Sequence, residues 1–168
     1  GIDRKNIDIP INQNKLIQEI CKVNNNVIVV LSNGSPIAMP WKDNVKAIIT
    51  GYLGGEAGGR AIVNCLIGKV NPSGKLSESY PKDLSDTPCY NYYPGTELIS
   101  EYKESIYVGY RYYDKVNKEV LFPFGFGLSY TQFQYSNLKV NKYDDKIEVK
   151  FKIKNIGKVT GKEIAQIY

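Results

Sequence analysis

Three stretches of the sequence carry side chains that could act on a substrate. Asp3 and Arg4 lie next to each other near one end, and Glu56 lies within a glycine-rich stretch at 51–59. A tyrosine-rich stretch follows at 107–114. Carboxylates can transfer protons, and aromatic rings can pack on the apolar faces of pyranose rings. These residue types point to proton transfer or sugar binding, although each stretch also has a purely structural interpretation.

The structural interpretations are specific. Asp3 and Arg4 could form an exposed ion pair worth at most about 1 kcal/mol. The tyrosines at 107–114 could instead hold a loop against a neighbouring domain, because a tyrosine has an apolar ring and a polar tip. Glu56 could offset the dipole at the start of a helix rather than act in catalysis. From the residues alone, these alternatives stay open.

The glycine-rich stretch does not match a nucleotide-binding motif. Its glycines follow the pattern G-x-x-G-G-x-x-G-G, and no Lys-Ser or Lys-Thr pair follows the last of them. The pattern is therefore neither a P-loop nor the dinucleotide-binding fingerprint. Close packing of a strand against a helix also needs small residues, and we expect these glycines to serve that purpose.

Composition excludes several classes of site. The chain of 168 residues has no histidine, so a Ser/His/Asp triad, a Cys/His pair and a typical zinc site cannot form within it. The net charge of +5 comes mostly from scattered lysines, and we expect no nucleic-acid partner. No stretch approaches the roughly 20 apolar residues that cross a bilayer, so we expect no membrane partner. Three widely spaced cysteines, expected to be free, favour a reducing compartment such as the bacterial cytoplasm.

The first half of the chain has an α/β pattern. A helical stripe at 12–24 includes Cys21 as an expected core residue, with Asn12 as a possible cap. Two apolar runs at 26–33 and 45–50 are typical of parallel strands that are buried on both faces. A helix ending at Gly68 should follow the glycines. This order predicts a layered α/β domain.

The second half has a different pattern. A turn at 71–76 should lead into a short strand, and an irregular region rich in tyrosine and proline follows at 80–113. Strict alternation at 146–154 predicts a half-buried antiparallel strand with Ile147, Val149, Phe151 and Ile153 on one face. Strands are also expected at 133–140 and from 161 to the end. Three such strands would be part of an Ig-like β-sandwich.

Taken together, six blocks of sequence resemble the family 3 glycoside hydrolases in order and spacing. The resemblance covers the whole chain, and it rests on the following blocks: Gly1-Ile-Asp-Arg4; Val27 to Pro36 with Pro40-Trp41; Gly51 to Gly59; Asn71-Pro-Ser-Gly-Lys-Leu76; Tyr107 to Asp114; and Phe122-Pro-Phe-Gly-Phe-Gly-Leu-Ser-Tyr-Thr131.

The resemblance implies a fold and an activity. Residues 1–79 would be the later part of an α/β sandwich domain, 80–130 an irregular connection packing on it, and 131–168 the start of a fibronectin III-like domain. The activity implied is that of a retaining, exo-acting, β-glucosidase-like enzyme, whose substrate is a carbohydrate and which needs no metal or other cofactor. Because the partial β-portion would leave an apolar face and strand edges exposed, we also expect a homodimer.

The resemblance also implies where the catalytic groups lie. The acid/base glutamate is expected immediately before Gly1 and the nucleophilic aspartate on an N-terminal barrel domain, so neither would be in this chain. Asp3 and Arg4 would lie at the edge of the substrate site. The alternative is a non-catalytic scaffold or carbohydrate-binding module whose tyrosine loop contacts sugar.

Overall fold

The computed structural model describes residues 4–95 and 98–168, which form two compact units. One unit comprises the residues up to Ile62 together with Leu76–Phe126, and the other comprises Val63–Lys75 together with Gly127–Tyr168. The secondary structure consists of helices and two separate sheets, in the order α1 (Ile11–Val23), β1 (Ile28–Leu31), η1 (Lys42–Asn44), β2 (Ala47–Thr50), α2 (Gly58–Leu66), η2 (Leu84–Asp86), α3 (Tyr110–Lys115), β3 (Phe133–Lys142) and β4 (Ile147–Asn155).

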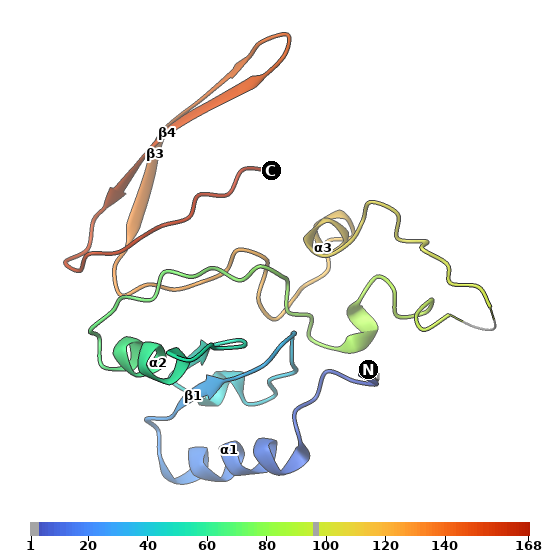
Figure 1. Ribbon diagram of the computed structural model, residues 1–168, viewed down its shortest axis with the longest axis vertical. Helices are drawn as coiled ribbons and strands as arrows, with labels where there is room; N and C mark the ends of the chain where they lie inside the picture. Colours follow the sequence, from blue (N-terminus) through green and yellow to red (C-terminus); the bar gives the residue numbers. More distant parts are fainter. Residues whose placement is uncertain (1–3, 96–97) are drawn as a thin grey trace. The chain divides into compact units, whose positions relative to one another are not determined.

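A parallel pair of strands organises the first unit (Figure 1). β1 and β2 pair in parallel with Ile28 opposite Ala47 and Leu31 opposite Thr50. This confirms the two strands expected from the apolar runs. Helix α1 precedes the pair, and its Ile17 packs against the buried cluster beneath the strands.

The parallel pair is not buried on both faces as the sequence predicts. Val29 and Ile48 pack against the core on one side. Ile28 and Val30, whose side chains point the other way along β1, keep 51% and 42% of their surface exposed. An apolar run is the same for a strand covered on one side or on two, so the pattern cannot tell them apart.

The core of this unit surrounds Trp41, which is fully buried. Leu31, Ile37, Met39 and Tyr80 complete the buried cluster. Tyr80 is 1% exposed and belongs to the region that lacks sequence periodicity. It forms an isolated antiparallel bridge with Phe122, so the irregular connection contributes to the core.

Two local expectations in this unit are wrong. Helix α1 begins at Ile11 after Pro10, and no side chain caps it, so Asn12 lies inside the helix. Proline suits the start of a helix because its missing N–H would have no partner there. The strand expected after the turn at 71–76 is also absent, and Leu76 forms only two backbone hydrogen bonds, with Phe126 and Gly125.

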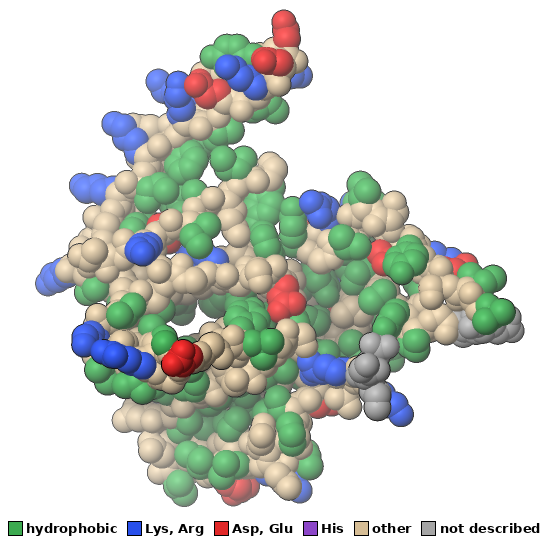
Figure 2. Space-filling view, viewed as in Figure 1, with side chains coloured by type: hydrophobic (Ala, Val, Ile, Leu, Met, Phe, Trp, Pro, Cys, Tyr) green, Lys and Arg blue, Asp and Glu red, His purple; other side chains and the backbone are tan. Residues whose placement is uncertain are grey.

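The second unit contains the antiparallel hairpin of β3 and β4 (Figure 1). Tyr135 lies opposite Ile153, Val140 lies opposite Val149, and the register shifts between Ser136 and Lys139. The apolar residues of β4 therefore share one face, as predicted, and the ring of Tyr135 stacks on Phe151 with centroids 6.0 Å apart. The lysines of β4 alternate onto the opposite face, and Figure 2 shows basic side chains along the hairpin.

The third strand expected from residue 161 does not form. This segment is held by side chains instead, since Glu163 accepts a hydrogen bond from the Tyr135 hydroxyl at 2.9 Å and lies 3.4 Å from the Lys75 ammonium. The Asn71 side chain amide also donates to the carbonyl of Thr160. A strand needs backbone pairing as well as alternation, and alternation in a sequence does not show whether that pairing forms.

Candidate functional site

The candidate site lies at the carboxyl ends of β1 and β2. Because the strands are parallel, the residues that follow Leu31 and Thr50 meet at one edge of the sheet. Open α/β sheets bind ligands at this edge. Ser32 and Asn33 follow β1, and Tyr52 follows β2.

Asn33 uses both ends of its side-chain amide at this edge. Its Nδ2 donates to the carbonyl oxygen of Ser35 at 2.9 Å and to the hydroxyl of Tyr80 at 3.0 Å. Its Oδ1 accepts a hydrogen bond from Thr50 Oγ1 at 2.9 Å. An asparagine amide has two N–H donors and a carbonyl acceptor, and both donors are used here. The side chain is therefore fixed in orientation and joins the ends of both strands.

Tyr52 extends this network. Its hydroxyl lies 3.4 Å from that of Tyr80, and its carbonyl oxygen accepts a hydrogen bond from Ser32 Oγ at 3.2 Å. Its φ of 46° lies in the left-handed region, which costs a residue with a bulky side chain about 1–3 kcal/mol. Burial, together with the neighbouring Tyr80 hydroxyl, raises the pKa of Tyr52. The phenol is therefore a neutral hydrogen-bonding group at physiological pH.

Glu78 is an acidic group close to Tyr52. Burial raises the pKa of its carboxyl group above the ordinary glutamate value. Its charge contributes in turn to the raised pKa of Tyr52. A carboxyl group in such surroundings holds its proton to higher pH than an exposed one.

Arg4 is hydrogen-bonded to the turn that follows β1 at this edge. Its Nη1 donates to Ser35 Oγ and, at 3.3 Å, to the carbonyl oxygen of Pro36. Farther along, the backbone N–H of Ala38 donates to the carbonyl oxygen of Ile7 at 2.8 Å. The segment from Arg4 to Ile7 thus runs along the turn that follows β1. Asp3, the other predicted binding residue, lies outside the described residues.

The glycine-rich stretch lies next to this network but serves packing only in part. A β-carbon on Gly51 would lie 3.1 Å from Cδ1 of Ile62, and one on Gly54 would lie 3.2 Å from the α-carbon of Gly58. These two positions fit the predicted close packing. A β-carbon at Gly55, Gly58 or Gly59 would meet no atom within 4 Å, so the packing explanation does not extend to them. Glu56 is exposed, two residues before α2.

Several tyrosines of the stretch at 107–114 pack against other residues of the same unit. Tyr113 is buried, and Tyr110 stacks on Phe124 with ring centroids 4.9 Å apart. The Arg111 guanidinium lies 5.0 Å from the Tyr110 ring. Tyr107 keeps 39% of its surface exposed. Packing therefore accounts for Tyr110 and Tyr113, while the Tyr107 ring has the Lys115 ammonium 5.8 Å from its centroid.

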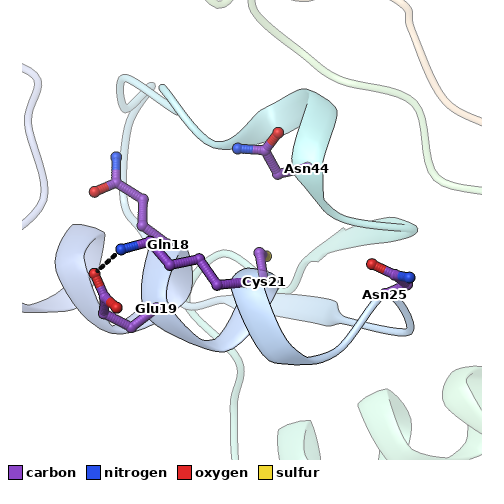
Figure 3. A pocket seen from close by; sticks show the side chains of 6 residues that line it. Gln18, Glu19, Cys21, Asn25 and Asn44 are labelled. Atoms are coloured by element: carbon purple, nitrogen blue, oxygen red, sulfur yellow. Dashed lines mark hydrogen bonds and ion pairs between the residues drawn. The ribbon is translucent and has the colours of Figure 1, made fainter.

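A shallow polar hollow lies beside α1, away from the strand ends (Figure 3). Glu19 is the carboxylate in its lining, and it pairs with the Lys22 ammonium at 2.6 Å. Cys21 also lines the hollow and is only partly buried, so it is not the core residue that the sequence predicts. The residues that line the hollow are Gln18, Glu19, Cys21, Lys22, Asn25 and Asn44.

Within residues 4–95 and 98–168, no group of three or more His, Cys, Asp or Glu side chains is placed to hold a metal ion. None of the helices in the described part of the chain has the length and apolarity needed to cross a membrane.

Sequence reasoning missed most of the polar network at the strand ends. It assigned Asp3 and Arg4 to the site and weighed Glu56 as a candidate, but it did not consider Asn33, Tyr52, Glu78 or Tyr80. Asn33 and Tyr52 could have been found from their positions directly after two strands predicted to be parallel. Tyr80 and Glu78 had no such signal, because they approach the edge from a connection without periodicity.

The family model, the relatives in sequence and the solved structures that this chain matches all belong to one group of proteins. The profile of the glycosyl hydrolase family 3 C-terminal domain matches residues 1–130. Thermostable beta-glucosidase B from Acetivibrio thermocellus is 52% identical over 172 residues, covering 100% of this chain and 23% of that protein. Beta-glucosidase from Kluyveromyces marxianus is 40% identical, again over 100% of this chain and 20% of the relative.

The solved structures agree with these relatives. The family 3 β-glucosidase from Bifidobacterium adolescentis superposes with a TM-score of 0.90 at 41% identity, covering 93% of this chain and 23% of that one. The β-glucosidase from Kluyveromyces marxianus in complex with glucose has a TM-score of 0.88 over 94% of this chain and 19% of that one. The chain therefore spans about a fifth to a quarter of the length of the relatives that it matches.

Proposed function

The chain belongs to the family of glycosyl hydrolase family 3 C-terminal domains, and from this we propose that it is part of a longer, retaining hydrolase that removes terminal sugars from β-glycosides. The observation that carries the proposal is the match over residues 1–130 together with relatives named as β-glucosidases. We also propose the domain division at residues 79 and 130 given by the resemblance.

The proposed chemistry needs two carboxyl groups on opposite sides of the scissile bond. In a retaining hydrolase these groups lie about 5–5.5 Å apart, one attacking the sugar and the other protonating the leaving oxygen. We assign the attack to an aspartate on a barrel domain outside this sequence. We assign proton donation to a glutamate immediately before Gly1. The 168 residues would then supply the surroundings of the acid rather than the acid itself.

The position of Arg4 supports this assignment. The proposed acid lies four positions before Arg4, and Arg4 is attached to the turn after β1 at the carboxyl edge of the sheet. That is the edge where ligands bind in folds of this class. We propose that Asp3 and Arg4 lie at the border of the sugar site.

The test compares the 168-residue chain with the longer natural protein on an aryl β-glucoside. We expect turnover only by the longer protein, and we expect it to fall by at least about 100-fold when the residue before Gly1 is changed to glutamine. Glu56→Gln and Glu78→Gln are matched controls, because both carboxylates are near the strand ends. Turnover by the chain alone that is lost in either control variant would contradict the assignment. Sugar binding without hydrolysis by the longer protein would instead favour the carbohydrate-binding alternative.

A further inference from the structure

We propose that Asn33 is a positioning residue that sets the place of Arg4, and through Arg4 the place of the general acid. This inference rests on the proposed function, and it adds a role for a residue that touches neither the sugar nor the reacting atoms. The structural basis is a chain of contacts from the buried core to the Arg4 guanidinium.

The inner end of this series of contacts is held by hydrogen bonds to the core and to the sheet. Tyr80 is almost fully buried, and its hydroxyl accepts a hydrogen bond from Asn33 Nδ2. Thr50, the last residue of β2, donates to Asn33 Oδ1. Asn33 is thus held from two directions by groups that belong to the core and to the sheet. Asn33 and Thr50 are half-buried and Tyr80 is buried, and polar groups that satisfy each other in such surroundings favour one geometry.

The outer end is the turn that receives Arg4. The second N–H of the Asn33 amide donates to the carbonyl oxygen of Ser35, and this bond closes the turn over a separation of two residues. Arg4 donates to the hydroxyl of that same Ser35 and to the carbonyl oxygen of Pro36. The acceptors of the guanidinium therefore lie on a turn whose shape depends on Asn33.

The residues that follow Arg4 are held to the first unit by contacts that do not involve Asn33. Ala38 donates to the carbonyl oxygen of Ile7, and Ile9 packs against the core. Loss of the Asn33 amide should therefore release the Arg4 end of the segment without detaching the rest. The proposed acid is four residues beyond Arg4, a reach of at most about 14 Å. A displacement of about 1 Å at a reacting group can cost a factor of about 100 in rate.

The dependence of the rate on the leaving group distinguishes a misplaced general acid from a general loss of active protein, because only the former affects one substrate more than the other. A 2,4-dinitrophenolate leaves with little need of a proton, whereas an alkoxide leaves only when its oxygen is protonated. We expect Asn33→Ala in the longer protein to lower kcat/KM by about 10- to 100-fold for methyl β-glucoside. For 2,4-dinitrophenyl β-glucoside we expect a change of less than about threefold, since proton donation contributes little there.

Two further variants complete the test. Arg4→Ala removes an exposed side chain, so it should fold. We expect its loss in kcat/KM to be about 10-fold or more larger for methyl β-glucoside than for 2,4-dinitrophenyl β-glucoside, because any contact of Arg4 with the sugar affects both substrates equally. If the two residues act through one another, the double variant should lose little more than either single variant. Asn14→Ala is the matched control, because it removes a comparable asparagine hydrogen bond in the same unit without a link to Arg4. We expect no selectivity between the two substrates from that change.

The outcomes separate the inference from the proposed function. A selective loss for methyl β-glucoside in both Asn33→Ala and Arg4→Ala supports the inference. An equal loss for both substrates, or no loss for either, in Arg4→Ala overturns it even if Asn33→Ala fails to fold. A parent protein that hydrolyses neither glucoside overturns the proposed function, and the inference fails with it.

Discussion

The indole N–H of Trp41 donates a hydrogen bond to Oδ1 of Asn14 at 2.8 Å. This contact joins helix α1 to the segment that leads into β2, across 27 positions of sequence. Trp41 is the largest side chain in the core and has no exposed surface. Its single polar atom is therefore satisfied by the helix that packs on it, as a buried indole requires.

Breaking this contact should destabilise the unit that contains it. We expect Asn14→Ala to lower the free energy of unfolding by about 1–2 kcal/mol, because the indole N–H then stays buried without a partner. Trp41→Ala should cost more, about 3–5 kcal/mol, since it also leaves a cavity. Urea unfolding followed by circular dichroism would measure both. A change below about 0.5 kcal/mol in Asn14→Ala would show that water replaces the lost acceptor.

The raised pKa of Glu78 predicts a pH-dependent gain in stability. Burial favours the protonated carboxyl group, so the folded state carries a penalty that appears as the pH rises through the raised pKa. Glu78→Gln removes the ionisable group. We expect it to raise the melting temperature at pH 7 and to leave it unchanged below about pH 4, where glutamate is protonated in both states. A gain of equal size at both pH values would rule out the ionisation as its cause.

Two glycines should respond in opposite ways to substitution by alanine. A β-carbon on Gly161 would lie 2.7 Å from Nδ2 of Asn71, the side chain that also accepts hydrogen bonds from Ser129 and Tyr130. We expect Gly161→Ala to cost about 1–3 kcal/mol through this overlap.

Gly58→Ala is the comparison, because its β-carbon would meet nothing within 4 Å and it lies in helix α2. We expect it to be neutral or to stabilise by up to about 1 kcal/mol, since alanine restricts the unfolded chain. Thermal unfolding of the two variants would measure the difference. Equal changes in stability would show that the space around the added β-carbon does not determine the effect of either substitution.

The apolar face of the β3–β4 hairpin predicts self-association of the 168-residue chain. Ile153 and its cross-strand partner Tyr135 keep 41% and 48% of their surface exposed. Exposed apolar faces and strand edges promote pairing between chains. We expect sedimentation velocity to show dimers or larger species, reduced by Ile153→Lys. Lys152→Glu, on the opposite face, should leave association unchanged, and a monomer at high concentration would contradict the prediction.

Much of this protein could be predicted from sequence because its signals are local. The apolar runs around Val29 and Ile48 predict strands, and the alternation from Ile147 to Ile153 predicts a strand with one apolar face. Both kinds of pattern follow from the geometry of the strand itself. The six motif blocks were also sufficient to identify the family. Asp3 and Arg4 were assigned to the edge of the substrate site from a motif and not from a contact, and that assignment stays a prediction.

The tertiary structure alone decided which residues meet at that edge. Asn33 and Tyr80 are 47 positions apart, and Tyr80 comes from a connection with no periodicity to place it. The same holds for Arg4 and the hydroxyl of Ser35, and for the absence of a strand after residue 161. Hydrogen bonds between distant residues depend on how the chain packs, whereas helix and strand patterns depend on neighbours in sequence. Sequence therefore determined the family and the elements with a strong local pattern, and packing determined the polar network at the strand ends.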